Sequence, residues 1–297
     1  MSGSSPLNGV LLIDKPEGLT SADVVRVVKK SLRPQKIGHL GTLDPFASGL
    51  LPLCLGTATK IAQFLMAEHK AYTGTIRLGI ETDTLDATGA ITRTTPVPWH
   101  ESDVLRDLER RFSGEYWQTP PMYSALKRDG VPLYKLARRG VVVDREPRKV
   151  IIETLVLTDA GGDTLHFFVS CSKGTYIRSL AADLGTALGC GAHLLTLRRT
   201  VFGPFSENEA IPLSVLPDRL AQDTLPLLSL SQSLCHYRTL PISPQVATEL
   251  RHGRQAILNN LPQIGSEQEV VQLLSEEGEL IALARREMEQ WRLVRVL

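Results

Sequence analysis

The sequence contains few cysteines, and none of them is spaced like a metal ligand. Four cysteines occur among 297 residues, and the two that are nearest in sequence, Cys171 and Cys190, are 19 residues apart. There is no C-x-x-C pair and no Cys/His spacing typical of a zinc site. We therefore expect no bound metal and no disulfide framework, and we expect four buried free thiols in a reducing compartment.

Membrane, targeting and nucleotide-binding features are also missing. No apolar run approaches the ~20 residues that span a bilayer, and residues 1–6 lack the basic flank and apolar stretch of a secretion signal. Neither a Walker A motif nor a G-x-G-x-x-G motif occurs, so we predict no cofactor. These absences predict a cytoplasmic protein without a membrane partner.

Charge is present in ordinary amounts but is unevenly distributed. Residues 1–205 carry 25 basic and 20 acidic side chains, whereas residues 206–297 carry 8 basic and 12 acidic ones and no lysine. Segment 127–149 alone has eight basic and three acidic residues. Such a segment is typical of a surface that contacts phosphates, although charge alone fits a solvated face equally well.

Helical and strand patterns alternate without a regular βαβ period, which favours an α+β fold. We expect a helix that is capped by Thr20-Ser21 and ends before Pro34, because Val24, Val28 and Leu32 recur at helical spacing. Further helices are predicted over 57–66, 102–113 and 175–188. Strands are predicted over 9–13, 50–55, 70–80, 150–157, 165–171 and 194–202, with loops over 36–49 and 118–132.

A change of composition after Phe205 indicates more than one domain. We predict a larger domain over 1–205 with a basic insertion around 127–149. A linker region over 206–236 and a small, mainly β domain over 237–297 would follow.

The densest group of special residues is the segment 38–50, GHLGTLDPFASGL. Three glycines and a proline in 13 residues indicate a backbone that is held in defined turns and that a ligand can approach closely. Asp44 lies at its centre between apolar neighbours. As an isolated dipeptide, Asp44-Pro45 would be read as a simple Asx turn.

This segment resembles the H-x-G-T/A-L-D-P-x-A-S/T-G-x-L signature of the TruB family of tRNA pseudouridine synthases. Five further blocks resemble family motifs and follow in the family's order. They are GVLLIDKP (9–16) with Thr20-Ser21, KAY (70–72), PMYSALK (121–127), CSKGTYIR (171–178), and GCGAH (189–193) with LRR (197–199). Together the blocks cover about residues 9–205.

The resemblance implies the isomerisation of uridine to pseudouridine, typically uridine-55 in the T loop of tRNA. It also implies a catalytic domain of pseudouridine-synthase type, with a mixed, largely antiparallel sheet, and a PUA-like C-terminal domain. The N1–C1′ bond is cut, the uracil turns and a C5–C1′ bond forms, so the reaction needs neither a cofactor nor an energy source. The nucleophile's attack at C6, its attack at C1′ and a glycal route all remain open.

Three residues carry the implied catalytic roles. By the resemblance, Asp44 is the nucleophile and Arg178 forms an ion pair with it, which would keep the carboxylate ionised in an apolar pocket. Tyr72 would stack on the uracil and serve as the base or relay for the C5 proton.

Other implied residues bind the substrate. His39 would occupy the space that the flipped base leaves, and Tyr176 and Leu197 would enclose that base. Lys15 would contact phosphates. The basic insertion would also contact the RNA backbone, as a mobile segment that orders on RNA. The residues that would make these contacts are Lys127, Arg128, Arg138 and Arg139.

Two other functions fit part of this pattern. One is a tRNA-binding folding chaperone whose catalysis is incidental or lost, and the other is a guide-RNA-dependent relative that works in a multi-protein particle. The acidic block 81–89, ETDTLDATG, lacks the EF-hand pattern and is better read as support for the catalytic loop than as a metal site. We expect a monomer that requires no protein partner.

Overall fold

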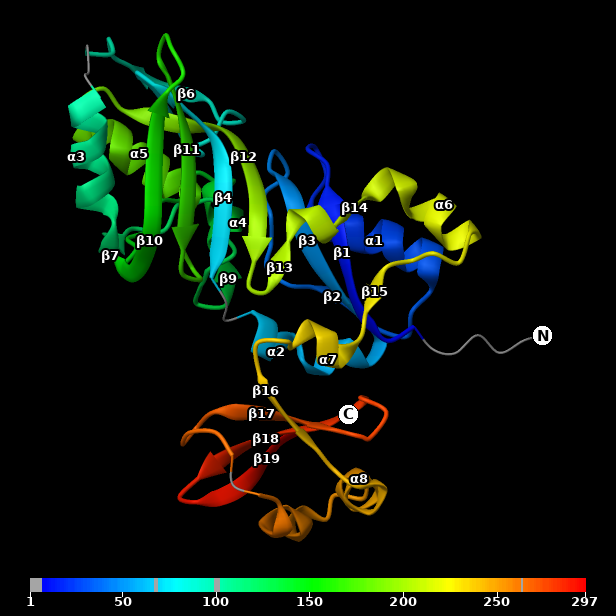
Figure 1. Ribbon diagram of the computed structural model, residues 1–297. Helices are drawn as coiled ribbons and strands as arrows, with labels where there is room; N and C mark the ends of the chain where they lie inside the picture. The colour runs from blue at the N-terminus through cyan, green and yellow to red at the C-terminus, as the bar shows by residue number, and fades with distance from the viewer. Residues whose placement is uncertain (1–6, 67–68, 99–101, 263) are drawn as a thin grey trace. The chain divides into compact units, whose positions relative to one another are not determined.

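Two structural units, each built from stretches that are distant in sequence, make up the chain (Figure 1). The first comprises Met1–Asp44, Leu50–Ala67 and Gly203–Leu297, and the second comprises Pro45–Gly49 and Glu68–Phe202. The computed structural model describes residues 7–66, 69–98, 102–262 and 264–297. Within these ranges no helix is long and apolar enough to cross a membrane.

The N-terminal part of the first unit is built around two buried strands, β1 (Gly9–Lys15) and β3 (Ser48–Leu55). β1 pairs in parallel with β14 (Ile211–Pro212) and antiparallel with β15 (Leu227–Leu228). Both β1 and β3 are apolar along nearly their whole length, as expected for central strands that are covered on both faces.

Helix α1 (Ser21–Leu32) forms as the sequence predicts. The Thr20 side chain accepts a hydrogen bond from Asp23 N, and the Asp23 carboxylate accepts one from Thr20 N, which completes a capping box. Val24, Val28 and Leu32 are buried on one side, and Arg33 ends the helix in the left-handed region with φ 49°.

The prediction of an uninterrupted loop over 36–49 is wrong, because β2 (Ile37–His39) lies within it. Three residues are too few to show an alternating pattern, and β2 exists because it pairs antiparallel with the end of β3. The helix expected over 57–66 is divided into a 3₁₀ turn, η1 (Gly56–Lys60), and a single α-helical turn, α2 (Ala62–Leu65).

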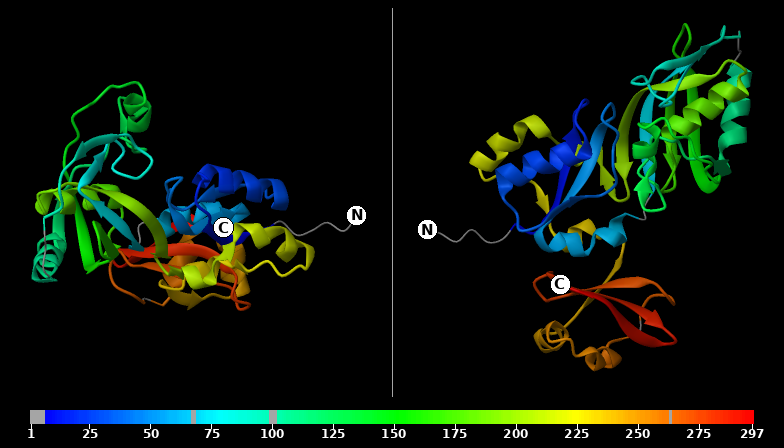
Figure 2. Two further views of the ribbon diagram at one scale, coloured as in Figure 1. Left: turned by 90° about the horizontal axis from the view of Figure 1, so that it is seen from above. Right: turned by 180° about the vertical axis from the view of Figure 1, so that it is seen from behind.

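The second unit contains five antiparallel strands in the order β12-β4-β11-β10-β7. Helices α3 (Ser102–Phe112) and α5 (Ile177–Ala187) lie on one face of this sheet (Figure 2). The strands are β4 (Lys70–Leu78), β7 (Gly114–Gln118), β10 (Arg148–Asp159), β11 (Thr164–Cys171) and β12 (Ala192–Phe202), and a separate hairpin joins β5 (Ile80–Thr82) to β6 (Ile91–Thr94).

The loop expected over 118–132 contains a small hairpin that the sequence analysis missed. β8 (Lys127–Arg128) and β9 (Val131–Pro132) are joined by Asp129 and Gly130, with φ 50° and 78°. An Asp-Gly pair with positive φ at both positions is a typical two-residue hairpin turn, so the sequence did carry the signal. Helix α4 (Leu133–Ala137) follows directly.

The C-terminal residues form a four-stranded sheet in the order β16-β17-β18-β19. Its strands are β16 (Arg238–Pro241), β17 (Val270–Leu274), β18 (Leu280–Glu287) and β19 (Gln290–Val296), with α8 (Pro244–Arg251) and η4 (Gln255–Asn260) between β16 and β17. Leu250, Leu258, Val271 and Trp291 belong to its core. Short elements precede this sheet; they are β13 (Phe205–Ser206), η2 (Glu207–Glu209), η3 (Leu213–Val215), α6 (Leu216–Ala221) and α7 (Leu230–Ser233).

The predicted fold class is confirmed: the protein is α+β, with mixed, largely antiparallel pairing and a small C-terminal sheet. The PUA-like character of that sheet and the proposed domain boundaries stay predictions. Cys54, Cys171 and Cys190 are buried, as expected, but the expectation is wrong for Cys235, which is exposed.

Candidate active site

The loop that carries Asp44 is held by the first residue of α1. Ser21 is 1% exposed, and its Oγ accepts a hydrogen bond from Leu43 N at 2.8 Å and donates one to Leu43 O at 3.2 Å. Leu43 is buried, and Asp44 next to it is half-buried. Because both backbone groups of Leu43 are satisfied by one buried side chain, the backbone that leads into Asp44 is fixed.

After Asp44 the chain continues into the segment Pro45–Gly49, which belongs to the second unit. Ser48 and Gly49 pair in parallel with Arg198 and Arg199 of β12. Gly49 has φ 99°, and a Cβ there would lie 2.4 Å from Arg199 O, so no other residue fits this position without a shift of the backbone. The glycine of the signature therefore serves a close approach between two strands.

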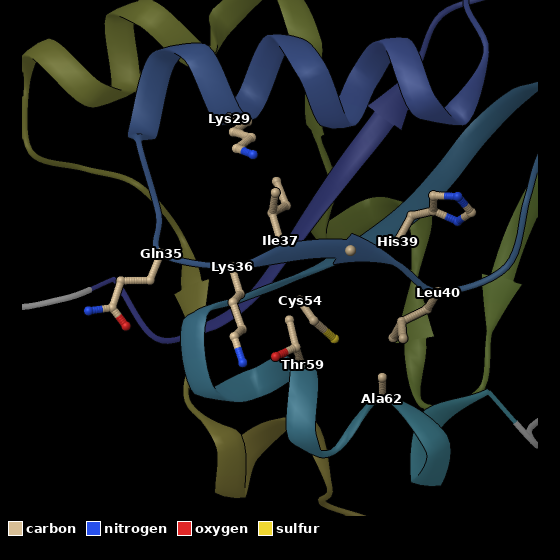
Figure 3. Close-up of a pocket in the computed structure, with 10 residues that line it drawn as sticks. Lys29, Gln35, Lys36, Ile37, His39, Leu40, Cys54, Thr59 and Ala62 are labelled. Carbon is tan, nitrogen blue, oxygen red and sulfur yellow. The ribbon is translucent and has the colours of Figure 1, made fainter.

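His39 lies at the end of β2 and borders a pocket of about 520 Å³ in the first unit (Figure 3). Lys29 reaches this pocket from α1, and Lys36 and Thr59 line it from other segments. The side chains around it carry two ammonium groups and polar atoms, which suits an anionic ligand.

Lys15, which was predicted to contact phosphates, is fully buried. Its Nζ donates hydrogen bonds to Pro16 O at 2.9 Å and Leu19 O at 2.7 Å. Both carbonyls belong to the turn that leads to the cap of α1. This geometry favours support of the turn over contact with a phosphate, and the role of Lys15 in substrate binding stays a prediction.

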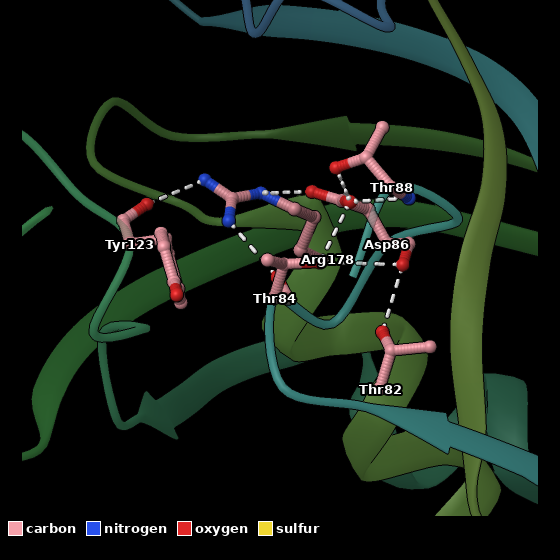
Figure 4. Close-up of polar contacts among 6 residues, drawn as sticks. All are labelled: Thr82, Thr84, Asp86, Thr88, Tyr123 and Arg178. Carbon is pink, nitrogen blue, oxygen red and sulfur yellow. Dashed lines mark hydrogen bonds and ion pairs between the residues drawn. The ribbon is translucent and has the colours of Figure 1, made fainter. Parts of the chain in front are cut away.

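Arg178, at the start of α5, is held from three sides within the second unit (Figure 4). Its Nε lies 3.7 Å from Asp86 Oδ2, and both side chains are 6% exposed. Nη1 donates to Thr84 O at 3.0 Å and Nη2 donates to Tyr123 O at 2.8 Å. A buried guanidinium with an anionic partner and two carbonyl acceptors is fixed in both position and charge.

The acidic block 81–89 supplies this anionic partner. Asp86 Oδ1 accepts hydrogen bonds from Thr84 Oγ1 at 2.8 Å, from Thr88 N at 2.9 Å and from Thr88 Oγ1 at 2.6 Å. Leu85 stands in the left-handed region with φ 63°, and its carbonyl accepts from Leu194 N. The left-handed conformation costs a residue other than glycine about 1–2 kcal/mol. The tertiary contacts that turn Asp86 toward Arg178 must therefore offset this strain.

Tyr72 and Arg199 are cross-strand partners on β4 and β12. Tyr72 is 7% exposed and Arg199 is 1% exposed. Burial lowers the pKa of the Arg199 guanidinium, while its charge interaction and hydrogen bond with the Tyr72 hydroxyl act in the opposite direction. Leu197, two residues before Arg199, pairs with Gly74 and is buried. The sheet register therefore brings Tyr72, Leu197 and Arg199 together.

Tyr176 precedes α5 and is held by its backbone. Its N–H donates to Gln118 Oε1 at 2.7 Å, and its carbonyl accepts from Gln118 Nε2 at 3.0 Å. Gln118 is 1% exposed and ends β7. No local pattern in the sequence points to this glutamine, because its partner is a backbone 58 positions away.

The four residues of the insertion that were predicted to contact the RNA backbone are exposed; they are Lys127, Arg128, Arg138 and Arg139. The Arg138 guanidinium lies 5.6 Å from the centre of the Tyr134 ring. Among the residues that the structure describes, no three His, Cys, Asp or Glu side chains form a group suited to a metal ion.

Comparison of the whole chain with known protein families shows its class, which is that of the pseudouridine synthases. The family model described as "TruB family pseudouridylate synthase (N terminal domain)" matches residues 29–177, and "tRNA pseudouridylate synthase B C-terminal domain" matches residues 178–231. The chain belongs to the TruB family. It is a tRNA pseudouridine synthase, which is an isomerase.

Curated relatives agree with this assignment. The chain is 52% identical over 223 residues to a tRNA pseudouridine synthase B from Aromatoleum aromaticum, covering 75% of this chain and 72% of that protein. It is 48% identical over 257 residues to the protein of the same name from Burkholderia mallei, covering 86% and 84%.

Solved structures give the same fold. A Cbf5–Nop10–Gar1 complex matches with a TM-score of 0.75 and 28% identity, over 97% of this chain and 84% of that one. An H/ACA RNP bound to a substrate RNA that contains 2′-deoxyuridine matches with a TM-score of 0.74 and 26% identity, over the same shares.

Proposed function

We propose that this chain isomerises uridine-55 in the T arm of tRNA with Asp44 as the nucleophile, after the target base has been flipped out of the loop. The observation that carries the proposal is the double restraint on the Asp44 loop, by Ser21 before it and by the Gly49–Arg199 pairing after it. A carboxylate held in place before the substrate arrives is what nucleophilic attack on a bound base requires.

Arg178 would hold the Asp44 carboxylate in its ionised form. A guanidinium has five N–H donors, so its contacts with Asp86, Thr84 and Tyr123 are compatible with a further bond to Asp44. The pair would orient the nucleophile and prevent its protonation in an apolar surrounding.

The remaining residues would bind the base and the RNA. Tyr72 would stack on the uracil and take the C5 proton, and Tyr176 and Leu197 would enclose the ring. His39 would fill the place of the flipped base, and the exposed basic residues of the insertion would contact phosphates. The N1–C1′ bond breaks, the C5–C1′ bond forms, the C5 proton leaves and N1 takes up a proton, so the overall change is redox-neutral.

Tritium release from tRNA transcript that carries [5-³H]uridine tests the proposal. Wild type should release tritium from a T-loop position, and Asp44→Asn should lower the rate by about 10⁴-fold or more while RNA affinity largely survives. Asp223→Asn, an exposed aspartate at φ 52° outside the site, is the matched control and should keep full activity. Comparable turnover by Asp44→Asn would remove Asp44 as the nucleophile.

The same assay separates the two alternatives. Tight tRNA binding without tritium release by wild type would favour the folding chaperone. Release only after a guide RNA and partner proteins are added would favour the particle-bound relative. We expect purified, monomeric protein to act on free tRNA, with size-exclusion chromatography coupled to light scattering as the check of its mass.

A further inference from the structure

Arg199 is a fully buried arginine in the described part of the second unit. Its guanidinium is 1% exposed, and it is the largest fully buried side chain among the residues described. Removing a guanidinium from water costs several kcal/mol, and arginine stays charged in proteins. The position of Tyr72, its cross-strand partner, explains why a cation is buried here.

The backbone of Arg199 is fixed from both sides. β4 pairs with it at Tyr72, and the segment that follows the Asp44 loop pairs with it at Gly49. The side chain is fixed as well, because its Cζ lies 5.1 Å from the centre of the Phe202 ring and it shares a hydrogen bond with the Tyr72 hydroxyl. The strand register, the Phe202 ring and this hydrogen bond therefore keep the guanidinium next to the Tyr72 hydroxyl.

We propose that Arg199 is a positioning residue of the isomerisation: its guanidinium holds the Tyr72 oxygen and favours the phenolate, so that Tyr72 accepts the proton that leaves C5. This inference rests on the proposed function. After the C5–C1′ bond has formed, the C5–H bond breaks and the proton passes to the Tyr72 oxygen, which later releases it to water. The electron pair of the C5–H bond restores the C5–C6 double bond, while C6 gives up either its bond to Asp44 or its second bond to N1, and N1 ends with a proton taken from water.

Three neighbouring basic or titratable residues of the second unit do not take this place: Arg198 pairs with Thr73 rather than Tyr72, and Lys70 and Cys171 lie elsewhere in the register. Lys70, on the same strand, places its Nζ 4.7 Å from the centre of the Phe202 ring. Cys171 pairs with Lys70 from β11, and burial raises the pKa of its thiol to about 11, so it is neutral at physiological pH. Arg199 is the cation directly opposite Tyr72 in the sheet register.

A double-mutant cycle under single-turnover conditions tests the proposal. Arg199→Gln should lower the rate at pH 7 by about 10- to 100-fold, with tRNA affinity changed less than twofold. In a Tyr72→Phe background the same substitution should have less than a threefold effect, because there is no phenolate left to favour. An equal loss in both backgrounds would overturn the proposal.

The pH profile gives a second readout that a purely structural role would not move. The alkaline rise of the rate should lie at least about one pH unit higher in Arg199→Gln than in wild type, so that raising the pH restores part of the activity. Arg199→Lys keeps the cation and should recover much of the loss. A parallel loss at every pH, or a lysine variant as weak as the glutamine variant, would overturn the proposal.

Controls separate this inference from the proposed function. If Arg199→Gln fails to fold by circular dichroism, Arg199→Lys takes its place in the cycle, with a smaller rate loss that should again vanish beside Tyr72→Phe. Arg77 lies on β4, as Tyr72 does, and forms an ion pair with Asp163 at 3.1 Å; the variant Arg77→Gln should behave as wild type. Absence of tritium release by wild type would refute the proposed function, whereas release with an additive cycle refutes only the role of Arg199.

Discussion

Asp86 and Arg178 form an ion pair in which both side chains are almost fully buried, with Arg178 Nε 3.7 Å from Asp86 Oδ2. Ninety-two positions separate them in sequence, and the acidic block at 81–89 therefore contacts an arginine at the start of a distant helix. Removing one partner of such a buried pair strongly destabilises the folded protein, because the other charge is left without compensation.

Asp86→Asn should therefore affect both stability and rate. We expect the free energy of unfolding to fall by about 3–5 kcal/mol and pseudouridine formation to slow by at least about tenfold, with tRNA affinity little changed. Chemical denaturation and tritium release measure the two effects. Asp83→Asn is the matched control, since Asp83 is exposed and accepts only a loop hydrogen bond from Ala90 N; an equal loss there would assign the effect to the loop as a whole.

Ser21→Ala should disturb the loop of Asp44 without touching the substrate. The two hydrogen bonds to Leu43 would be lost in a buried site, at a cost of about 1–3 kcal/mol. We expect a lower kcat with a nearly unchanged KM, because the nucleophile would be less well placed. Ser31→Ala removes an exposed hydroxyl from the same helix and should leave both constants unchanged; a KM effect alone for Ser21→Ala would contradict this account.

Stability should depend on pH through Asp183. The Tyr116 hydroxyl donates a hydrogen bond to Asp183 on α5. Burial raises the pKa of Asp183 above its ordinary value of 3.8, with the bond to Tyr116 acting the other way. The folded state therefore binds a proton at higher pH than the unfolded state, so this carboxyl lowers stability as pH rises from 3.8 through the folded pKa.

Asp183→Asn keeps the acceptor for Tyr116 and removes the charge. The variant should melt at a higher temperature than wild type at pH 7, and the difference should shrink as the pH is lowered toward 3.8. Thermal unfolding followed by circular dichroism between pH 3.5 and 8 tests this expectation. A difference in Tm that is constant over that range would show that Asp183 does not titrate as described.

Thiol reactivity should divide the cysteines into two groups. Burial raises the pKa of Cys54 to about 12 and that of Cys171 to about 11, and Cys190 is raised as well. Only a thiolate reacts rapidly with an alkylating agent. Iodoacetamide at pH 8 should therefore label the exposed Cys235 in the folded protein, and the other three only after denaturation, as mass spectrometry of the peptides would show. Labelling of Cys54 in the native state would contradict its burial.

Local patterns in the sequence were enough for several elements. Thr20 and Ser21 before three apolar residues at helical spacing predict α1, because capping and amphipathic burial act within a dozen residues. The alternation in 150–157 and 165–171 predicts two strands, which pair as β10 and β11. Where such patterns were too short, as in β2, or where an Asp-Gly turn was overlooked, as between β8 and β9, the prediction failed.

The sequence by itself determined the family, the α+β class and the choice of Asp44 as the candidate nucleophile, because motifs and periodicities are local and can be read along the chain. Only the tertiary structure decided that Ser21 braces Leu43, that Asp86 is a partner of Arg178, and that Arg199 stands opposite Tyr72. Each of these relationships joins residues more than 20 positions apart, and the register of a sheet or the start of a helix brings them together. No local propensity encodes such a contact, because it follows from how the whole chain buries its apolar surface and satisfies its polar groups.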